Sequence, residues 1–196
     1  MTLTPLTGWL DYDRPRLANL SSRQRVLYFR KRLSIVLLPA LGDLYRGIRP
    51  GPQPSPLLVF ATAVCCSMEA FGKFKNGGSG HNCTRFNAFV DAYMHSDYST
   101  RTVGGKTYKE ILWKHYRNGL AHGFAVSHGG FEVFPGYFQV RRIAGHDALM
   151  INPEHFYRDF RSGVAKYLRE LKSAGPSDPI RLNFDKVFKA VFIDGH

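Results

Sequence analysis

Residues 56–74 read PLLVFATAVCCSMEAFGKF, one of the two most apolar segments of the chain. Apolar side chains lie nearly all round a helix of this sequence, so other helices must cover it. Pro56 suits an early helical position because the first N–H groups of a helix have no partner within it. The following loop at 75–80, KNGGSG, ends the helix. We therefore expect a central buried helix inside a helical bundle.

Apolar periodicity and capping residues predict further helices on both sides of this one. Residues 21–22 are serines that can cap a basic helix, and Pro39 should kink or end it because proline lacks an N–H. Asn152 as N-cap and Pro153 at the first helical position open the last long helix, which ends at 175–176. The predicted helices cover residues 21–39, 56–74, 83–95, 107–121 and 152–175.

The periodicity changes after the fourth of these helices. Aromatic and β-branched residues at 124–142 surround Gly-Gly at 129–130 and Pro-Gly at 135–136, which predicts a β-hairpin or small meander. The fold class is therefore mainly α, a bundle of about five helices with a small β-hairpin inserted between the last two. We expect an irregular N-terminal arm at 1–20, the bundle at 21–175 and a mixed C-terminal tail at 176–196.

The composition favours one folded domain with a polyanionic partner. The 196 residues are 44% hydrophobic and carry a formal net charge of +12. This charge favours nucleic acid, nucleotides or an anionic membrane surface, although a basic protein can have none of these partners. The start of the chain shows no signal-peptide pattern, and no segment reaches the roughly 20 apolar residues of a membrane span. We expect a cytoplasmic protein with no membrane span.

No pattern in the sequence predicts a metal or another cofactor. Cys65, Cys66 and Cys83 fit no zinc spacing, and we expect the adjacent pair to pack in the core as small apolar side chains. The glycine loop at 75–80 is not followed by the Lys-Ser/Thr of a P-loop.

The functional signal lies in LWKHYRNGLAHG, residues 112–123. On a helical wheel of about 100° per residue, Arg117, Asn118 and His122 flank an outward face. Arginine keeps its charge and can fork onto phosphate oxygens, while histidine titrates near neutrality and can move a proton. Asn118 can orient either group. An Arg and a His at this spacing also occur by chance on a solvated helix face. The side chains expected to face the core are Tyr108, Leu112, Trp113, Tyr116 and Leu120.

This run resembles the signature helix of the HEPN superfamily, in which an Arg is followed after four to six residues by a His, with a polar residue favoured directly after the Arg. Arg117, Asn118 and His122 match that pattern position for position, and the surrounding helical bundle agrees with it. The resemblance is specific over about a dozen residues and loose over 60–175. The basic N-terminal region, the hairpin and the tail have no counterpart in it.

The resemblance implies an RNA-cleaving domain that works as a homodimer, with Arg117 and His122 as the catalytic pair, Asn118 as a supporting residue and no metal. HEPN proteins commonly pair two motif helices across a cleft, and many are endoribonucleases of toxin–antitoxin, abortive-infection and CRISPR-associated systems. An antitoxin protein is then an expected partner. Others have lost catalysis, so the alternative is a non-catalytic module that binds RNA, a nucleotide or a protein. A bundle used for assembly alone is a third interpretation.

Several other side chains are candidates for contact with RNA or for packing around the motif. Lys73, Arg85, Lys109 and Lys114 could form a phosphate track, or they are scattered solvated residues. The basic cluster at 23–32 could bind RNA or, less readily, a membrane surface. Glu69, near the end of the apolar helix, needs a partner if it is buried, and we expect Arg117 or Lys114 to supply it. Hairpin aromatics could stack on bases or pack on the helices; they are Phe131, Phe134, Tyr137 and Phe138.

Overall fold

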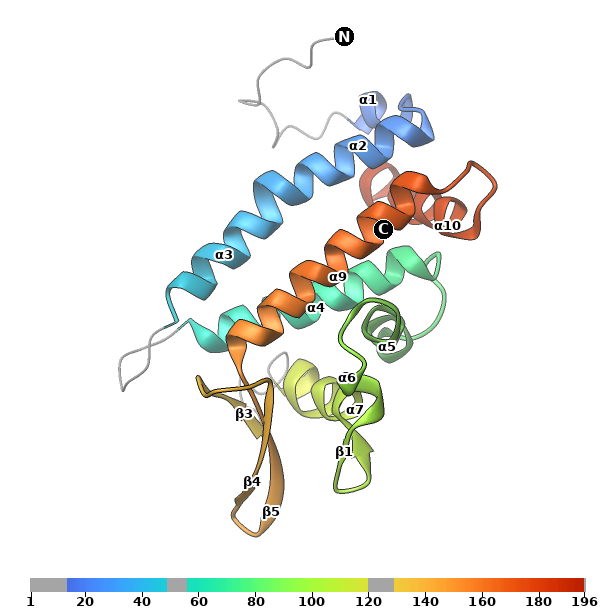
Figure 1. Ribbon diagram of the computed structural model, residues 1–196. Helices are drawn as coiled ribbons and strands as arrows, with labels where there is room; N and C mark the ends of the chain where they lie inside the picture. Colours follow the sequence, from blue (N-terminus) through green and yellow to red (C-terminus); the bar gives the residue numbers. More distant parts are fainter. Residues whose placement is uncertain (1–13, 49–55, 120–128, 196) are drawn as a thin grey trace.

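The computed structural model describes residues 14–48, 56–119 and 129–195, and this part of the chain is mainly helical with two small sheets (Figure 1). Its first half contains α1 (Arg14–Ala18), α2 (Ser22–Arg32), the π-helical segment η1 (Leu33–Leu37), α3 (Leu38–Arg46), α4 (Leu57–Lys75) and α5 (Asn82–Tyr93). The middle contains α6 (Asp97–Thr100), β1 (Thr102–Val103), β2 (Lys106–Thr107), α7 (Tyr108–Ile111) and η2 (Leu112–Arg117). The remainder contains β3 (Gly129–Phe131), β4 (Phe138–Ile143), β5 (His146–Ile151), α9 (Pro153–Ser173), α10 (Pro179–Phe188) and η3 (Lys189–Asp194).

Helix α4 is the expected central helix, and α3, α5, α9, α10 and η2 all pack against it. Its side chains Phe60, Val64, Met68 and Phe71 are buried in one continuous core that these neighbours share. Among the described residues α4 alone is long and apolar enough to cross a membrane, and half of that stretch is buried inside the bundle. A core helix of a folded bundle has these same properties.

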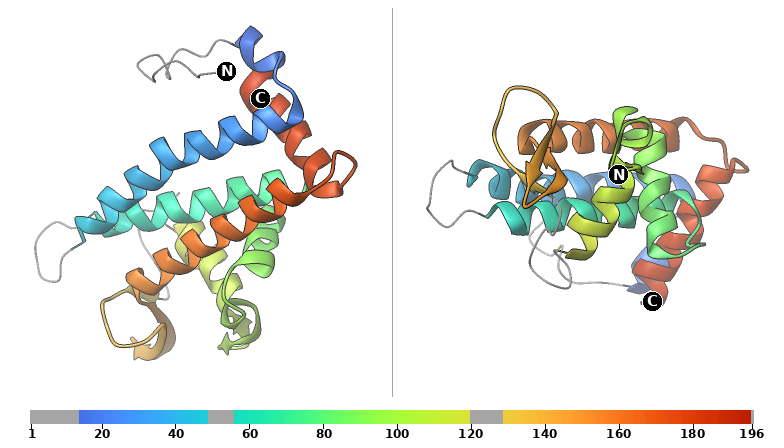
Figure 2. Two further views of the ribbon diagram at one scale, coloured as in Figure 1. Left: turned by 45° about the horizontal axis from the view of Figure 1, so that its top comes forward. Right: turned by 90° about the horizontal axis from the view of Figure 1, so that it is seen from below.

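Segments α2, η1 and α3 form one long helical rod along the outer side of the bundle (Figures 1 and 2). Ser21 caps it as expected, because its side chain accepts from the N–H of Gln24 and the Gln24 side chain accepts from the N–H of Ser21. The rod does not end at Pro39. The π-helical turn just before Pro39 widens the helix, which relieves the clash that a proline ring makes with the carbonyl of residue i−4.

The described residues at both ends of the chain are more helical than their sequence predicts. The arm at 1–20 contains α1, while residues 1–13 lie outside the described part. The prediction of a mixed tail at 176–196 is wrong. Most of this segment forms α10, which packs against α4, and η3, which packs against α1. Pro179 occupies the first turn of α10, and an apolar stripe follows at a helical spacing. The buried residues of that stripe are Phe184, Val187, Phe188 and Phe192.

The hairpin predicted at 124–142 lies further along the chain. Residues 120–128 are outside the described part, and the antiparallel pair is β4 with β5, joined by Ala144 and Gly145. Both turn residues have positive φ, as a two-residue hairpin turn of type I′ requires. Strand β3 pairs with β5 in parallel, so the strand order is β3-β5-β4. The turn was missed because Ala precedes Gly145 where Asn or Asp is usual.

We predict that Gly72→Ala destabilises the protein through the crossing of α4 and α5. A Cβ atom at Gly72 would lie 1.7 Å from the carbonyl oxygen of Arg85, so the two helices would have to separate. We expect a loss of roughly 3 kcal/mol, as for severe overpacking. The control is Gly42→Ala in α3, where a Cβ atom meets nothing closer than 3.4 Å. There we expect a gain of up to about 1 kcal/mol from helix propensity. Urea unfolding measures both, and equal stabilities would contradict the prediction.

We predict that Asp159→Asn stabilises the protein at neutral pH and has no effect in acid. Asp159 lies on α9 and is 9% exposed. Burial raises the pKa of its carboxyl above the ordinary value, and the nearby His95 opposes this shift only in part. Because the folded pKa is raised, the wild type loses stability as the pH rises from the ordinary Asp pKa through the folded value. Asparagine removes this loss, and each kcal/mol gained should raise the melting temperature by about 2–4 °C.

Melting curves between pH 4 and pH 8 test this prediction. The same substitution at the exposed Asp147 is the control. A gain from Asp159→Asn that is the same at both ends of the pH range would contradict the assigned cause.

Candidate functional site

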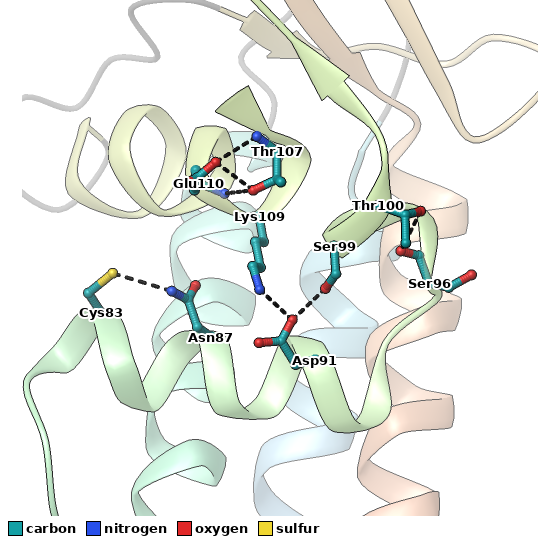
Figure 3. Close-up of polar contacts among 9 residues, drawn as sticks. All are labelled: Cys83, Asn87, Asp91, Ser96, Ser99, Thr100, Thr107, Lys109 and Glu110. Atoms are coloured by element: carbon teal, nitrogen blue, oxygen red, sulfur yellow. Dashed lines mark hydrogen bonds and ion pairs between the residues drawn. The ribbon is translucent and has the colours of Figure 1, made fainter. Parts of the chain in front are cut away.

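The motif helix begins at a strong cap and then changes its winding. The hydroxyl of Thr107 accepts from the N–H of Glu110, and the Glu110 carboxylate accepts from the N–H of Thr107 (Figure 3). The first turn, α7, is α-helical, but residues 112–117 form the π-helical segment η2. A π-helix bonds residue i to i+5 and therefore turns through a smaller angle per residue than an α-helix.

Because of this change of winding, the helical wheel predicts the wrong direction for Arg117. Tyr108, Leu112 and Tyr116 are buried, as expected for the core face. Arg117, however, does not point outward: its side chain is 14% exposed and lies against α4. His115 is also buried, which the wheel did not indicate. Lys114 is the exposed side chain of the segment. The wheel assumed an α-helical angle at every residue, and that assumption fails across η2.

Arg117 is held from three sides. Its Nε and Nη2 atoms both donate to Oε2 of Glu69, at 2.9 and 2.6 Å, and the Glu69 side chain is 16% exposed. Its Nη1 atom donates to Oδ1 of Asn118 at 3.2 Å. Its guanidinium carbon lies 4.9 Å from the ring centroid of Trp113, a cation–π contact. The expected pairing of Glu69 with Arg117 is therefore confirmed, whereas the contact with Trp113 was not foreseen.

Within the described residues, these contacts engage only part of the guanidinium. A guanidinium carries five N–H hydrogens, and the three bonds to Glu69 and Asn118 use one each on Nε, Nη1 and Nη2. In the described part of the chain, no partner takes the other hydrogen on each of the two terminal nitrogens. Such a pair can fork onto two oxygens of a phosphate or carboxylate group. Glu69 and Trp113 restrict how the guanidinium can turn, so this fork is preorganised.

Tyr116 anchors the motif helix to the three-stranded sheet. Its hydroxyl accepts from the N–H of Gly130 at 2.8 Å and lies within hydrogen-bond reach of the carbonyls of Gly130 and Leu149. A Cβ atom at Gly129 would lie 2.4 Å from this hydroxyl, so the close approach requires glycine. This contact holds η2, which precedes residues 120–128, against β3, which follows them. His122 belongs to that stretch and lies outside the described residues.

The four basic residues expected to contact RNA divide into two kinds. Lys109 forms an ion pair with Asp91 of α5 at 2.6 Å (Figure 3), and Arg85 donates to the carbonyl of Gly78 at 2.6 Å. Both therefore hold the protein's own structure together. Lys114 is exposed and lies three residues before Arg117. Lys73 is half-buried on α4, one turn after Glu69. The last two thus lie on the segments that supply the Arg117–Glu69 pair.

The cysteines and the hairpin aromatics have mainly packing roles. Cys65 is buried as expected, but Cys66 is exposed, because the neighbours of α4 leave one of its faces open. Within the described ranges no group of three or more His, Cys, Asp or Glu side chains could hold a metal ion. Phe131 packs on Tyr116 and on Phe156 of α9, so it supports the sheet.

Comparison with known proteins adds no assignment to this geometry. A scan against models of protein families, a search of curated proteins and a search of solved structures each return no match. The resemblance of residues 112–123 to the HEPN signature helix therefore stays a prediction.

We predict that Glu69 and Arg117 are strongly coupled in the folded state. Glu69→Ala and Arg117→Ala should each cost roughly 3 kcal/mol, because each leaves one charge of a mostly buried pair without its partner. The double variant should cost less than the sum, with a coupling of about 1–3 kcal/mol. The control pair is Asp43 with Arg46, whose side chains are mostly exposed and whose coupling should be at most about 1 kcal/mol. Additive losses at Glu69 and Arg117 in urea unfolding would contradict this picture.

Proposed function

We propose that this protein is a HEPN-like, metal-independent endoribonuclease, with Arg117 and His122 as its catalytic pair and Asn118 in support. The observation that carries the proposal is the guanidinium of Arg117, which Glu69, Trp113 and Asn118 hold in place and whose two other N–H groups have no partner among the described residues. The formal charge of +12 supports a polyanionic substrate. The exposed Lys114 adds a second cation beside the motif.

The chemistry follows from the two side chains of the motif. The 2′-hydroxyl of a ribose attacks the adjacent phosphorus, and the bond from phosphorus to the 5′-oxygen of the next nucleotide breaks. The products are a 2′,3′-cyclic phosphate and a 5′-hydroxyl. The free N–H groups of Arg117 stabilise the negative charge that builds up on the phosphate oxygens. His122 moves the proton from the attacking oxygen or to the leaving oxygen, since its charge can change near neutral pH.

The proposal includes a homodimer in which two motif helices meet. One motif helix carries one Arg117 and one His122, and a two-fold axis beside it would bring both copies to one composite cleft. A toxin–antitoxin or phage-defence setting, with an antitoxin as protein partner, belongs to the same proposal. The homodimer, the defence setting and the antitoxin partner are proposed from the resemblance of residues 112–123 to the HEPN signature.

We predict that the purified protein cleaves single-stranded RNA in the presence of a chelator and leaves the matching DNA intact, because DNA has no 2′-hydroxyl. Arg117→Ala should lower the rate by about 10²–10³, the usual effect of losing one charge-stabilising donor. His122→Ala should lower it by about 10²–10⁴, as for loss of a general acid–base group. The control is Lys172→Ala at an exposed position on α9.

Three outcomes of this assay decide the proposal. Intact RNA with the wild type, or equal cleavage by the Arg117 and His122 variants, would show that this pair is not catalytic. Tight RNA binding in a gel shift without product would favour the non-catalytic binding module instead. No shift with any nucleic acid would count against both.

A further inference from the structure

Strand β4 forms an outer edge of the three-stranded sheet. The strand order is β3-β5-β4, and among the described elements β5 alone packs extensively on β4. Strand β1 comes close to β5 rather than to β4, so in this part of the chain it covers a face of the sheet and not this edge. The hairpin of β4 and β5 projects away from the helical bundle (Figure 1).

A hydrogen bond at the start of β4 determines which backbone groups face outward. The N–H of Asn152 donates to the carbonyl of Tyr137 at 3.1 Å, in continuous register with the pairing of β4 and β5. In an antiparallel pair, residues that bond to the partner strand alternate with residues that do not. Every second residue after Tyr137 therefore bonds to β5. The residues between them, Phe138, Val140 and Arg142, direct their N–H and C=O groups toward the outer edge.

This edge lacks most of the features that keep other strands from pairing with it. Proteins commonly protect an edge with a proline, a β-bulge, a very short strand or charged side chains. Strand β4 has six residues, contains no proline and pairs with β5 in unbroken register, so it has no bulge. Val140 and Ile143 are 47% and 49% exposed. Of these protective features, β4 has only its two arginines, Arg141 and Arg142.

The two arginines determine which kind of strand can pair here. Arg141 is engaged by Glu132 and Gln139. Arg142 is exposed and forms no ion pair within the described residues, although Asp147 lies opposite it on β5. A second copy of β4 would bring two more arginines to this edge of a chain with a formal net charge of +12, so repulsion opposes it. An acidic strand would instead place a carboxylate beside Arg142.

We propose that β4 is a docking edge for an acidic, extended segment of another protein, which adds to the sheet as a fourth strand. Main-chain hydrogen bonds to Val140 and Arg142 hold the segment, and its carboxylates contact the Arg142 guanidinium. The added strand extends the sheet to which Tyr116 of the motif helix is anchored. This docking does not depend on the ribonuclease activity proposed above.

The test uses three synthetic peptides about as long as β4. A Glu-Val repeat is acidic and prefers an extended strand, a Glu-Pro repeat has the same charge but cannot pair as a strand, and a Lys-Val repeat has the opposite charge. We expect the wild type to bind the Glu-Val repeat about tenfold more tightly than the other two, roughly the effect of one to three net hydrogen bonds. Fluorescence anisotropy at physiological ionic strength measures the three affinities.

Variants at two positions separate the backbone from the side chains. Val140→Pro removes an outward N–H and spares the bonds to β5, so it should lower the affinity for the Glu-Val repeat about tenfold. Val140→Ala, which keeps the N–H, should lower it less than about threefold. Arg142→Glu should reverse the preference between the Glu-Val and Lys-Val repeats. Lys172→Glu makes the same change of charge at an exposed position of α9 and should leave the preference unchanged.

Amide hydrogen exchange of the wild type gives a readout that does not depend on the folding of a variant. In the free protein, the N–H groups of Val140 and Arg142 should exchange faster than those of Gln139 and Arg141, which bond to β5. The Glu-Val repeat should slow exchange at Val140 and Arg142 several-fold, and the Glu-Pro repeat should not.

Several outcomes would overturn the docking edge. Equal, salt-dependent binding of the Glu-Val and Glu-Pro repeats would show attraction of charge without strand pairing, and binding of neither would exclude an acidic strand. Slow exchange at Val140 and Arg142 in the free protein would show that the edge is already paired, by a second copy if the protection rises with protein concentration. Loss of single-stranded RNA binding on Arg142→Glu, with no binding of the Glu-Val repeat, would show that the hairpin contacts RNA instead.

Discussion

The structure depends on the burial of α4, a helix that is apolar over most of its circumference. Such a helix cannot remain exposed in water, so other segments must cover it from several directions. Helix α5 approaches so closely that Gly72 admits no side chain, and α10 returns from the end of the chain to pack on it. The side chains of Cys66 and Ala70 stay exposed on α4, and Glu69 between them in sequence pairs with Arg117 of η2.

The candidate site follows from a local departure from α-helical winding. Because η2 is π-helical, Arg117 turns toward α4 and meets Glu69, a carboxylate that would otherwise be a costly polar group on an apolar helix. The two charges are each about 15% exposed, so an anion at the guanidinium would be in a less polar environment than water. π-helical turns within helices often occur at functional sites, which agrees with this placement.

Short-range signals in the sequence predicted much of the fold. The serine at 21, the threonine at 107 and Asn152 each cap a helix, because a cap depends on residues within three positions of it. The Ala144–Gly145 turn escaped prediction because Ala stands where Asn or Asp is usual. The π-helical segment η2 escaped it because no local signal marks its winding, and Arg117 at its end meets a partner 48 residues away in sequence. Helix α10 was also not predicted. Its apolar stripe is recognised as a packing face only when α4 is known to lie against it.

The sequence by itself determined that α4 is buried, where the main helices begin, and that Arg117 and Asn118 lie on one of them. Those features depend on local propensity and on the period of apolar residues. Only the tertiary structure decided that Arg117 faces Glu69 and Trp113, and that an apolar groove opens between α4 and the α2–η1 rod. The direction of a side chain depends on the winding of its helix, and a groove depends on which helices leave a face uncovered. Both are set by packing between segments that lie far apart in the chain.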